Sequence, residues 1–120
     1  MRPRCVRPAS ALLLLAFLAL APACAHGGSA GAEARQATIE TNLPALQACW
    51  TDIAADYPDR AGSLLFAVDI RRNGSVEWVD IEIDEMQVPR LSACAVKQIK
   101  RWRFPEGSRQ SIRFGIGFAG

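Results

Sequence analysis

The chain has 120 residues, of which 50% are hydrophobic, and this length suits one small domain. Its formal net charge is +2, but three basic residues, Arg2, Arg4 and Arg7, lie in the N-terminal segment. Without that segment the net charge is about −1. We therefore expect no nucleic-acid binding, because a basic surface supplies most of the affinity for nucleic acids.

Residues 1–23 have the pattern of a signal peptide. A basic start is followed by the apolar run Ala9–Ala21, which is shorter than the about 20 residues that a membrane-spanning helix needs. The residues before position 24 fit ordinary cleavage, and Leu20 to Cys24 also resemble a lipobox, in which Cys24 is lipidated and becomes the N-terminus. We expect an exported, periplasmic protein that is attached to a membrane through Cys24, with an unattached periplasmic form as the alternative.

Residues 24–36 are small, polar and rich in glycine, which predicts a flexible tether in front of a domain that spans residues 37–120. Fully extended, this tether would reach at most about 45 Å. His26, the only histidine of the chain, lies in the tether and is expected to be solvated rather than to act as a ligand or a base.

A first helix is predicted over residues 43–56. Helical spacing relates an apolar stripe that consists of Ile39, Leu43, Leu46, Trp50 and Ile53. Pro44 suits the first turn of a helix and damages an interior, so the cap is expected at Thr41 or Asn42. Residues 36–42 are then either a preceding turn of helix or an extended lead-in.

Two strands joined by a tight turn follow the first helix. The apolar residues of the first strand alternate on one face and are Leu64, Phe66, Val68 and Ile70. Asn73-Gly74 predicts a hairpin in which this pair supplies the positive φ angles of the turn. The second strand covers about residues 75–84, and its apolar phase slips, which a β-bulge near Trp78 would reconcile.

A second helix opens at Val88-Pro89, and its buried stripe should consist of Leu91, Ala95, Ile99 and Trp102. The last strand, Ser111–Phe118, alternates between large apolar residues on one face and small or polar residues on the other. The element order is α-β-β-α-β. It predicts an α+β fold in which two helices pack on one face of a three-stranded, mainly antiparallel sheet.

Cys49 and Cys94 are the two cysteines inside the expected domain, and each lies on a predicted helix. In an exported protein such a pair predicts a disulfide that joins the two helices. Closing a loop of about 45 residues should contribute about 4 kcal/mol in the chain-entropy model. Free buried thiols and a reactive or regulatory pair are the alternatives.

Several segments together resemble the C-terminal domain of TonB. They are Tyr57-Pro58, Gly62, Phe66–Ile70, Asn73–Val76, Val79–Ile81 and Lys100–Phe104. With Cys49-Trp50, Cys94 and Trp102–Pro105, the chain looks more specifically like the variant of that domain which ends gliding-motility proteins of the AgmX/PglI type. TonB itself carries an uncleaved membrane anchor and a long proline-rich rod, which this sequence does not show, so energy transduction is not expected.

The resemblance implies binding rather than catalysis. TonB-like domains pair with an extended peptide of a partner by strand addition, in which main-chain hydrogen bonds supply much of the affinity. The last strand is the candidate edge, with Ser111, Arg113, Gly115 and Gly117 on its outer face, and Trp78 is the tryptophan expected to be exposed. The partner would be an envelope protein or a peptide segment of one. In the alternative, the two glycines relieve crowding under a buried tryptophan or end the sheet.

Other functions find less support in the residues. No catalytic, metal or cofactor site is expected, because the single histidine excludes a Ser-His-Asp or Cys-His arrangement in the domain and two cysteines do not make a zinc site unaided. The acidic second strand is expected to be a solvated face, paired with Arg71 or Arg113 across the sheet. One alternative function is a cell-wall or glycan-binding module that uses Trp78 and the basic residues between positions 97 and 101. Another is a structural subunit of an envelope machine.

Overall fold

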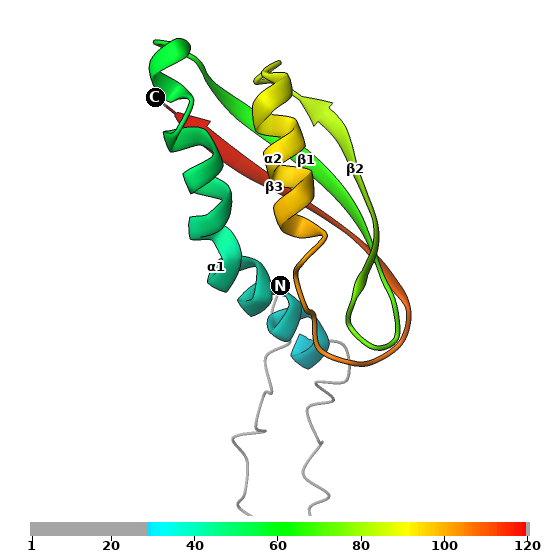
Figure 1. Ribbon diagram of the computed structural model, residues 1–120. Coiled ribbons are helices and arrows are strands. Elements are labelled where there is room, and N and C mark those ends of the chain that lie inside the picture. Colours follow the sequence, from blue (N-terminus) through cyan, green and yellow to red (C-terminus); the bar gives the residue numbers. More distant parts are fainter. Residues whose placement is uncertain (1–28, 120) are drawn as a thin grey trace, which may run out of the picture.

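The computed structural model describes residues 29–119 and has the predicted α+β fold, with the chain order that Figure 1 shows. Its elements are α1 (Ser29–Thr51), the short 3-10 helix η1 (Ala54–Asp56), β1 (Ala61–Ile70), β2 (Val76–Asp84), α2 (Pro89–Ile99) and β3 (Gln110–Ala119). The predicted signal peptide, Cys24 and His26 lie outside the described residues. None of the helices in residues 29–119 has the length and hydropathy of a membrane span.

The three strands form one antiparallel sheet in the order β2-β1-β3, so β3 is an edge strand, as the sequence predicted. β1 and β3 pair without a register shift over all 10 residues of each strand. The pairing of β1 with β2 shifts twice, once beside Trp78 and once between Leu65 and Phe66. The β-bulge predicted near Trp78 is confirmed, and the second shift marks another bulge along β2.

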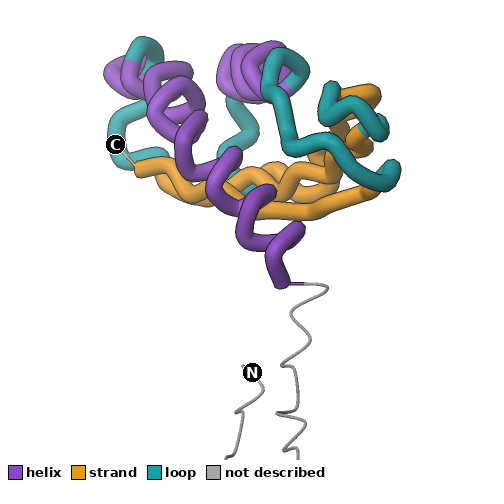
Figure 2. Tube along the Cα trace, turned by 90° about the horizontal axis from the view of Figure 1, so that it is seen from below, coloured by secondary structure: helices purple, strands orange, loops and turns teal. Residues whose placement is uncertain are grey.

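α1 and α2 cover one face of the sheet and leave the other face open (Figure 2). The core lies between the two layers and combines the apolar faces of the strands with the buried stripes of the helices. Its fully buried side chains include Leu46, Leu64, Phe66, Leu91 and Ile99. Trp50 and Trp102 are 3% and 4% exposed, which confirms that both belong to the core.

Cys49 of α1 and Cys94 of α2 form the predicted disulfide, with their Cα atoms 5.8 Å apart. The bond joins the last turns of α1 to the middle of α2, so it ties together the two helices of the upper layer. It leaves no free cysteine among the described residues. The alternative of two free buried thiols is therefore wrong.

α1 begins at Ser29, well before the predicted start of the first helix at residue 43. The flexible tether predicted for residues 24–36 is therefore wrong from Ser29 onward. The small residues of this segment include several alanines, which have the highest helix propensity of all residues. The helix also buries Ile39 against the core, a contact that an extended segment would not make.

Pro44 lies inside α1 rather than in its first turn, and the predicted caps Thr41 and Asn42 are interior residues as well. A proline inside a helix removes a backbone donor and costs about 3 kcal/mol or more, so packing of the apolar stripe must outweigh that cost. Asn42 Nδ2 donates to the carbonyl of Thr38 (2.8 Å) instead of capping the helix. The helix ends at Thr51, earlier than predicted.

The hairpin between β1 and β2 forms as predicted, but its turn has one positive φ angle. Gly74 has φ +84°, whereas Asn73 does not adopt a positive φ. Gly74 N–H donates to the carbonyl of Arg71 (2.9 Å), and Arg71 N–H donates to the carbonyl of Ser75 (2.9 Å). This pattern is typical of a three-residue loop in which the glycine forms a bulge. Asn73 instead accepts a hydrogen bond from Ser75 N–H through Oδ1 (3.0 Å).

Candidate functional site

The candidate site is the free edge of β3. In an antiparallel strand, every second residue turns both of its backbone groups to the same side. Ser63 of β1 turns its groups toward β2, because its N–H donates to the Glu85 side chain (2.9 Å) and its carbonyl accepts from the Glu85 N–H (3.0 Å). The neighbours of Ser63 in β1 therefore pair with β3. The residues of β3 whose backbone groups point away from the sheet are Ser111, Arg113, Gly115, Gly117 and Ala119.

α1 closes the C-terminal end of this edge. Gln47 Nε2 donates to the carbonyl of Gly117 (3.2 Å). The indole N–H of Trp50 donates to the carbonyl of Ala119 (3.0 Å). These two side chains occupy acceptors that an added strand would need, so the last residues of β3 are already engaged. Gly117, although predicted as a binding residue, therefore lies at the closed end of the edge.

The N-terminal half of β3 remains available for pairing. In the part of the chain that the structure describes, no hydrogen bond reaches the outward backbone groups of Ser111, Arg113 and Gly115. Each of these residues presents one donor and one acceptor, and a row of such groups is a template for another strand. Three of the four residues predicted on β3 therefore keep the capacity to pair.

Gly115 and Gly117 are not required by packing against the described residues. A Cβ atom on Gly115 would meet only the carbonyl of Leu64, at 3.9 Å, and a Cβ atom on Gly117 would meet no atom within 4 Å. Relief of crowding under a buried tryptophan, the alternative explanation for these glycines, is therefore wrong. The two glycines leave the open face of β3 bare, so that another backbone can approach it closely.

A groove of about 300 Å³ lies between β3 and the first half of α1. Its α1 wall includes Arg35, Gln36 and Ile39, and its β3 wall includes Ile112 and Phe114. A peptide added to the edge of β3 would lie beside this groove and could place a side chain in it. The sequence predicted this wall only in part, because Arg35 and Gln36 were assigned to the tether, whereas Ile39 belonged to the predicted apolar stripe in a segment whose helical state was left open.

β2 is the other edge of the sheet and is less suited to strand addition. Its two register shifts interrupt the regular alternation of outward backbone groups. Bulges of this kind protect an edge strand against pairing with another chain. β3 pairs regularly with β1 along its whole length. It is therefore the edge that can extend the sheet.

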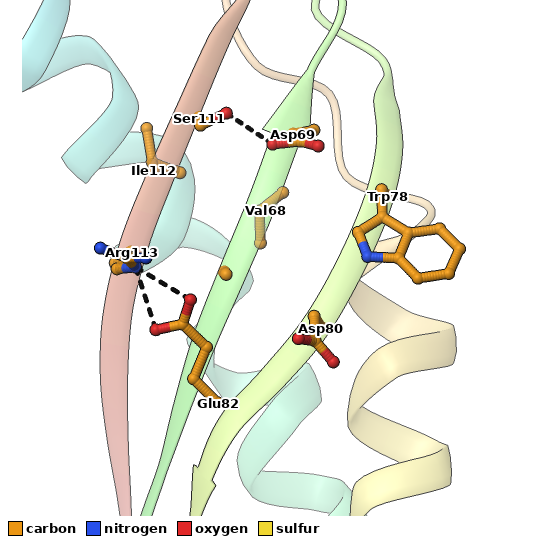
Figure 3. A pocket seen from close by; sticks show the side chains of 9 residues that line it. Val68, Asp69, Trp78, Asp80, Glu82, Ser111, Ile112 and Arg113 are labelled. Atoms are coloured by element: carbon orange, nitrogen blue, oxygen red, sulfur yellow. Dashed lines mark hydrogen bonds and ion pairs between the residues drawn. The ribbon is translucent and has the colours of Figure 1, made fainter.

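The open face of the sheet carries a shallow polar groove of about 540 Å³ (Figure 3). Arg113 of β3 reaches across β1 to Glu82 of β2, with 3.0 Å between Arg113 Nε and Glu82 Oε2. Ser111 Oγ donates to Asp69 Oδ1 (2.6 Å). The expected pairing of the acidic strand with Arg113 is confirmed. The side chains of Ser111 and Arg113 are thus bonded to neighbouring strands of the same sheet. A partner would therefore recognise these two residues mainly through their backbone groups.

Trp78 is exposed, as the sequence predicted, with 61% of its surface accessible. It lies on β2, and β1 separates it from the other predicted binding residues on β3. Figure 3 shows its indole turned away from Arg113 and Glu82. Because adjacent strands are about 4.8 Å apart, the backbone of Trp78 lies about 10 Å from the backbone of β3. Trp78 nevertheless lines the open-face groove together with Ser111 and Arg113, so the structure brings these predicted residues to one groove, with Trp78 on the strand farther from the β3 edge.

The carboxyl group of Glu85, the residue after β2, has a lowered pKa. The hydroxyl and the backbone N–H of Ser63 both donate to Glu85, and these hydrogen bonds lower the pKa of Glu85. The group is exposed, and its contacts with Ser63 join β1 to the residue that follows β2. Over residues 29–119, no group of three or more His, Cys, Asp or Glu side chains is arranged to hold a metal ion.

Ser63→Ala should raise the pKa of Glu85 toward its ordinary value, because the hydroxyl donor is lost. In the natural protein, the lowered pKa of Glu85 contributes stability above its unfolded pKa, and this contribution is lost as the pH falls through the folded pKa. An NMR titration of the Glu85 carboxyl group measures the shift. Identical titration curves for the two proteins would contradict the role of the Ser63 hydroxyl.

Comparisons of the chain with protein-family models, with curated proteins and with solved structures give no match. The resemblance to the C-terminal domain of TonB therefore stays a prediction from the sequence segments that carry it. What the chain does must be argued from the chemistry of the β3 edge and from the surfaces around it.

Proposed function

We propose that this protein is a non-catalytic binding module of the cell envelope, which captures an extended segment of a partner protein as a fourth strand beside β3. The observation that carries the proposal is the row of unpaired backbone groups at Ser111, Arg113 and Gly115 on a regular edge strand. The groove beside α1 leaves room for side chains of the added chain. The resemblance to TonB-like terminal domains points to the same mode of binding.

Main-chain pairing of this length gives a modest affinity. The three outward residues offer about six hydrogen bonds, each worth about 0.5–1.5 kcal/mol net. Ordering the peptide opposes part of this gain, so selectivity must come from side chains that enter the groove against α1. The groove combines the apolar Ile39 and Phe114 with Arg35. It suits a segment in which an apolar side chain lies near an acidic one.

The proposal includes export and a lipid on Cys24. The disulfide between Cys49 and Cys94 supports an oxidising compartment, since structural disulfides rarely persist in the cytosol. A domain held close to a membrane by such an anchor can capture a partner at that membrane. The intact mass of the purified protein tests the anchor, because acylation of Cys24 adds a large mass.

Gly115→Pro should weaken capture of the partner at least about tenfold, because it removes an outward donor and places a ring at the pairing edge. The Gly115 N–H points away from β1, so the substitution removes no hydrogen bond of the β1–β3 ladder. To identify the partner, a photoreactive residue is introduced at position 111 in living cells and crosslinked by light. Mass spectrometry of the crosslinked peptide then identifies the partner and the segment that it contributes.

Gly115→Ala is the matched control, because it keeps the N–H and its Cβ would meet only the carbonyl of Leu64, at 3.9 Å. Crosslinking should persist with alanine and disappear with proline, and equal crosslinking in both variants would exclude pairing at this edge. Amide exchange with the identified peptide gives a second readout. Protection should rise at Ser111, Arg113 and Gly115 but not at the residues between them, which already pair with β1.

A further inference from the structure

The charges of the described residues are unevenly distributed between the two ends of the molecule. One end, at the bottom of Figure 1, holds the hairpin turn, the last turn of α2 and the connection from α2 to β3. Its exposed basic residues are Arg71, Arg72, Lys97, Lys100, Arg101, Arg103 and Arg109. The acidic residues of the opposite end include Asp52, Asp56, Asp59, Asp84 and Glu85. The basic end also holds Glu106 and Glu77, the latter paired with Arg109, so seven cations face two carboxylates there. The domain is therefore dipolar although its net charge is small.

Backbone contacts hold the segments of this basic end together. Gly107 N–H donates to the carbonyl of Arg72 (3.0 Å), and Ser75 and Arg103 form an isolated β-bridge. In the part of the chain that the structure describes, Arg72, Arg101 and Arg103 form no ion pair. The basic end is therefore a fixed positive surface and not a flexible basic tail.

The chain enters the domain at this same end. Gly31 and Arg35 of α1 line one cavity, of about 240 Å³, with residues 104–107 of the α2–β3 connection. Arg35 thus adds a positive charge to the basic end. Cys24 precedes Ser29, where α1 begins, by five residues. A group attached to Cys24 can therefore lie at most about 17 Å from that start.

We propose that the basic end rests on the surface of an anionic phospholipid bilayer. The uncompensated cations form one surface, and the connection to Cys24 leaves the domain from that same surface. A basic surface is a common second signal beside a lipid anchor, and each Lys or Arg near an anionic membrane raises the affinity about fivefold. The acidic end is repelled, so the domain is oriented. This inference does not rest on strand addition at β3.

The experiment uses residues 25–120 without a lipid, because every core residue lies between Ile39 and Phe118. The protein is mixed with vesicles of phosphatidylcholine alone, or with vesicles in which about a third of the lipid is phosphatidylglycerol, at low ionic strength where screening is weak. Flotation measures the bound fraction. We expect binding to the anionic vesicles, no binding to the neutral ones, and release as salt is added.

Arg72→Glu should lower binding at least about fivefold, and the double variant Arg72→Glu/Arg101→Glu at least about 25-fold. Arg90→Glu is the control, because it makes the same change of net charge at the start of α2. It also breaks the ion pair of Arg90 with Asp56 (2.7 Å), which is exposed and contributes little to stability. That position is about 16 Å along the helix from Arg101, which is farther than the screening length at physiological salt. The control should change binding less than about twofold, and circular dichroism checks that all variants are folded.

Equal losses for Arg72→Glu and Arg90→Glu would overturn the proposal, because only net charge would then matter. No binding of the natural sequence to anionic vesicles would overturn it as well. If the protein instead co-sedimented with purified cell-wall sacculi and ignored the vesicles, the basic end would belong to the glycan-binding alternative. None of these results depends on whether β3 captures a partner.

Discussion

A chain in which Cys49 and Cys94 are both replaced by alanine should lose about 4 kcal/mol of its free energy of unfolding. The disulfide spans a sequence separation of 45 residues, and its removal restores the entropy of that loop to the unfolded chain. Small domains have a net stability of about 5–15 kcal/mol, so a large share depends on this one bond. Denaturant unfolding followed by fluorescence measures the loss, since Trp50 and Trp102 are buried.

Reduction of the natural protein also removes the bond between Cys49 and Cys94, without a substitution. It therefore allows a second comparison of the domain with and without the disulfide. The midpoint of unfolding in a reducing agent should approach that of the double alanine variant, and the variant itself should not respond to the reducing agent. If the natural protein unfolded at the same denaturant concentration with and without reduction, the loop entropy would not be the source of its stability. Any remaining difference in the free energy of unfolding between the reduced natural protein and the variant measures the packing that is lost with the two sulfur atoms.

The disulfide lies beside the contacts that close one end of the β3 edge. Cys49 lies between Gln47 and Trp50, the two α1 residues that donate to the last carbonyls of β3. With α1 fixed against α2, these donors stay in place and the C-terminal end of the edge stays closed. The disulfide and the burial of Leu46 and Trp50 thus act together to hold α1 where it closes this end of the edge.

The elements with clear periodicity were predictable from the sequence. Apolar spacing located the start of α2 and both ends of β3 to within one or two residues, because each element buries one face against the core. The predicted stripe of α2 ran on to Trp102, which is buried but lies beyond the end of the helix at Ile99. The start of α1 was not predictable by the same means, since its first turns combine alanine with glycine and polar residues and show no apolar stripe. Their helical state depends on alanine propensity, on the Gln36–Glu40 hydrogen bond (3.1 Å), and on the contact of Ile39 with the core.

The candidate site was predictable only in part, for a related reason. The alternation of β3 and its glycines indicated an edge with a bare face, and that information is local. The closure of the edge at Gly117 comes from Gln47, 70 residues away in the sequence, so no local pattern could reveal it. The position of Trp78 across β1 from the other candidates likewise follows from the strand order, which local patterns in the sequence do not reveal.

Gly74→Ala should destabilise the domain by at least about 3 kcal/mol. Gly74 has φ +84°, a conformation that costs about 1–2 kcal/mol for a residue with a Cβ atom. A Cβ atom there would also overlap the carbonyl oxygen of Phe104, at 1.9 Å. The α2–β3 connection would have to move, which breaks the hydrogen bond from Phe104 N–H to the Gly74 carbonyl (2.8 Å). Thermal and denaturant unfolding measure the effect.

Gly107→Ala is the control, because this glycine lies in the same connection, has no positive φ, and a Cβ atom on it would meet nothing within 4 Å. It should change stability by less than about 0.5 kcal/mol. Equal effects of the two substitutions would show that the close approach of the hairpin to the connection is unimportant. Because Arg72 and Arg103 lie on the two segments that this approach joins, Gly74→Ala should also spread the cations of the basic end. Vesicle binding should then weaken although no charge has changed.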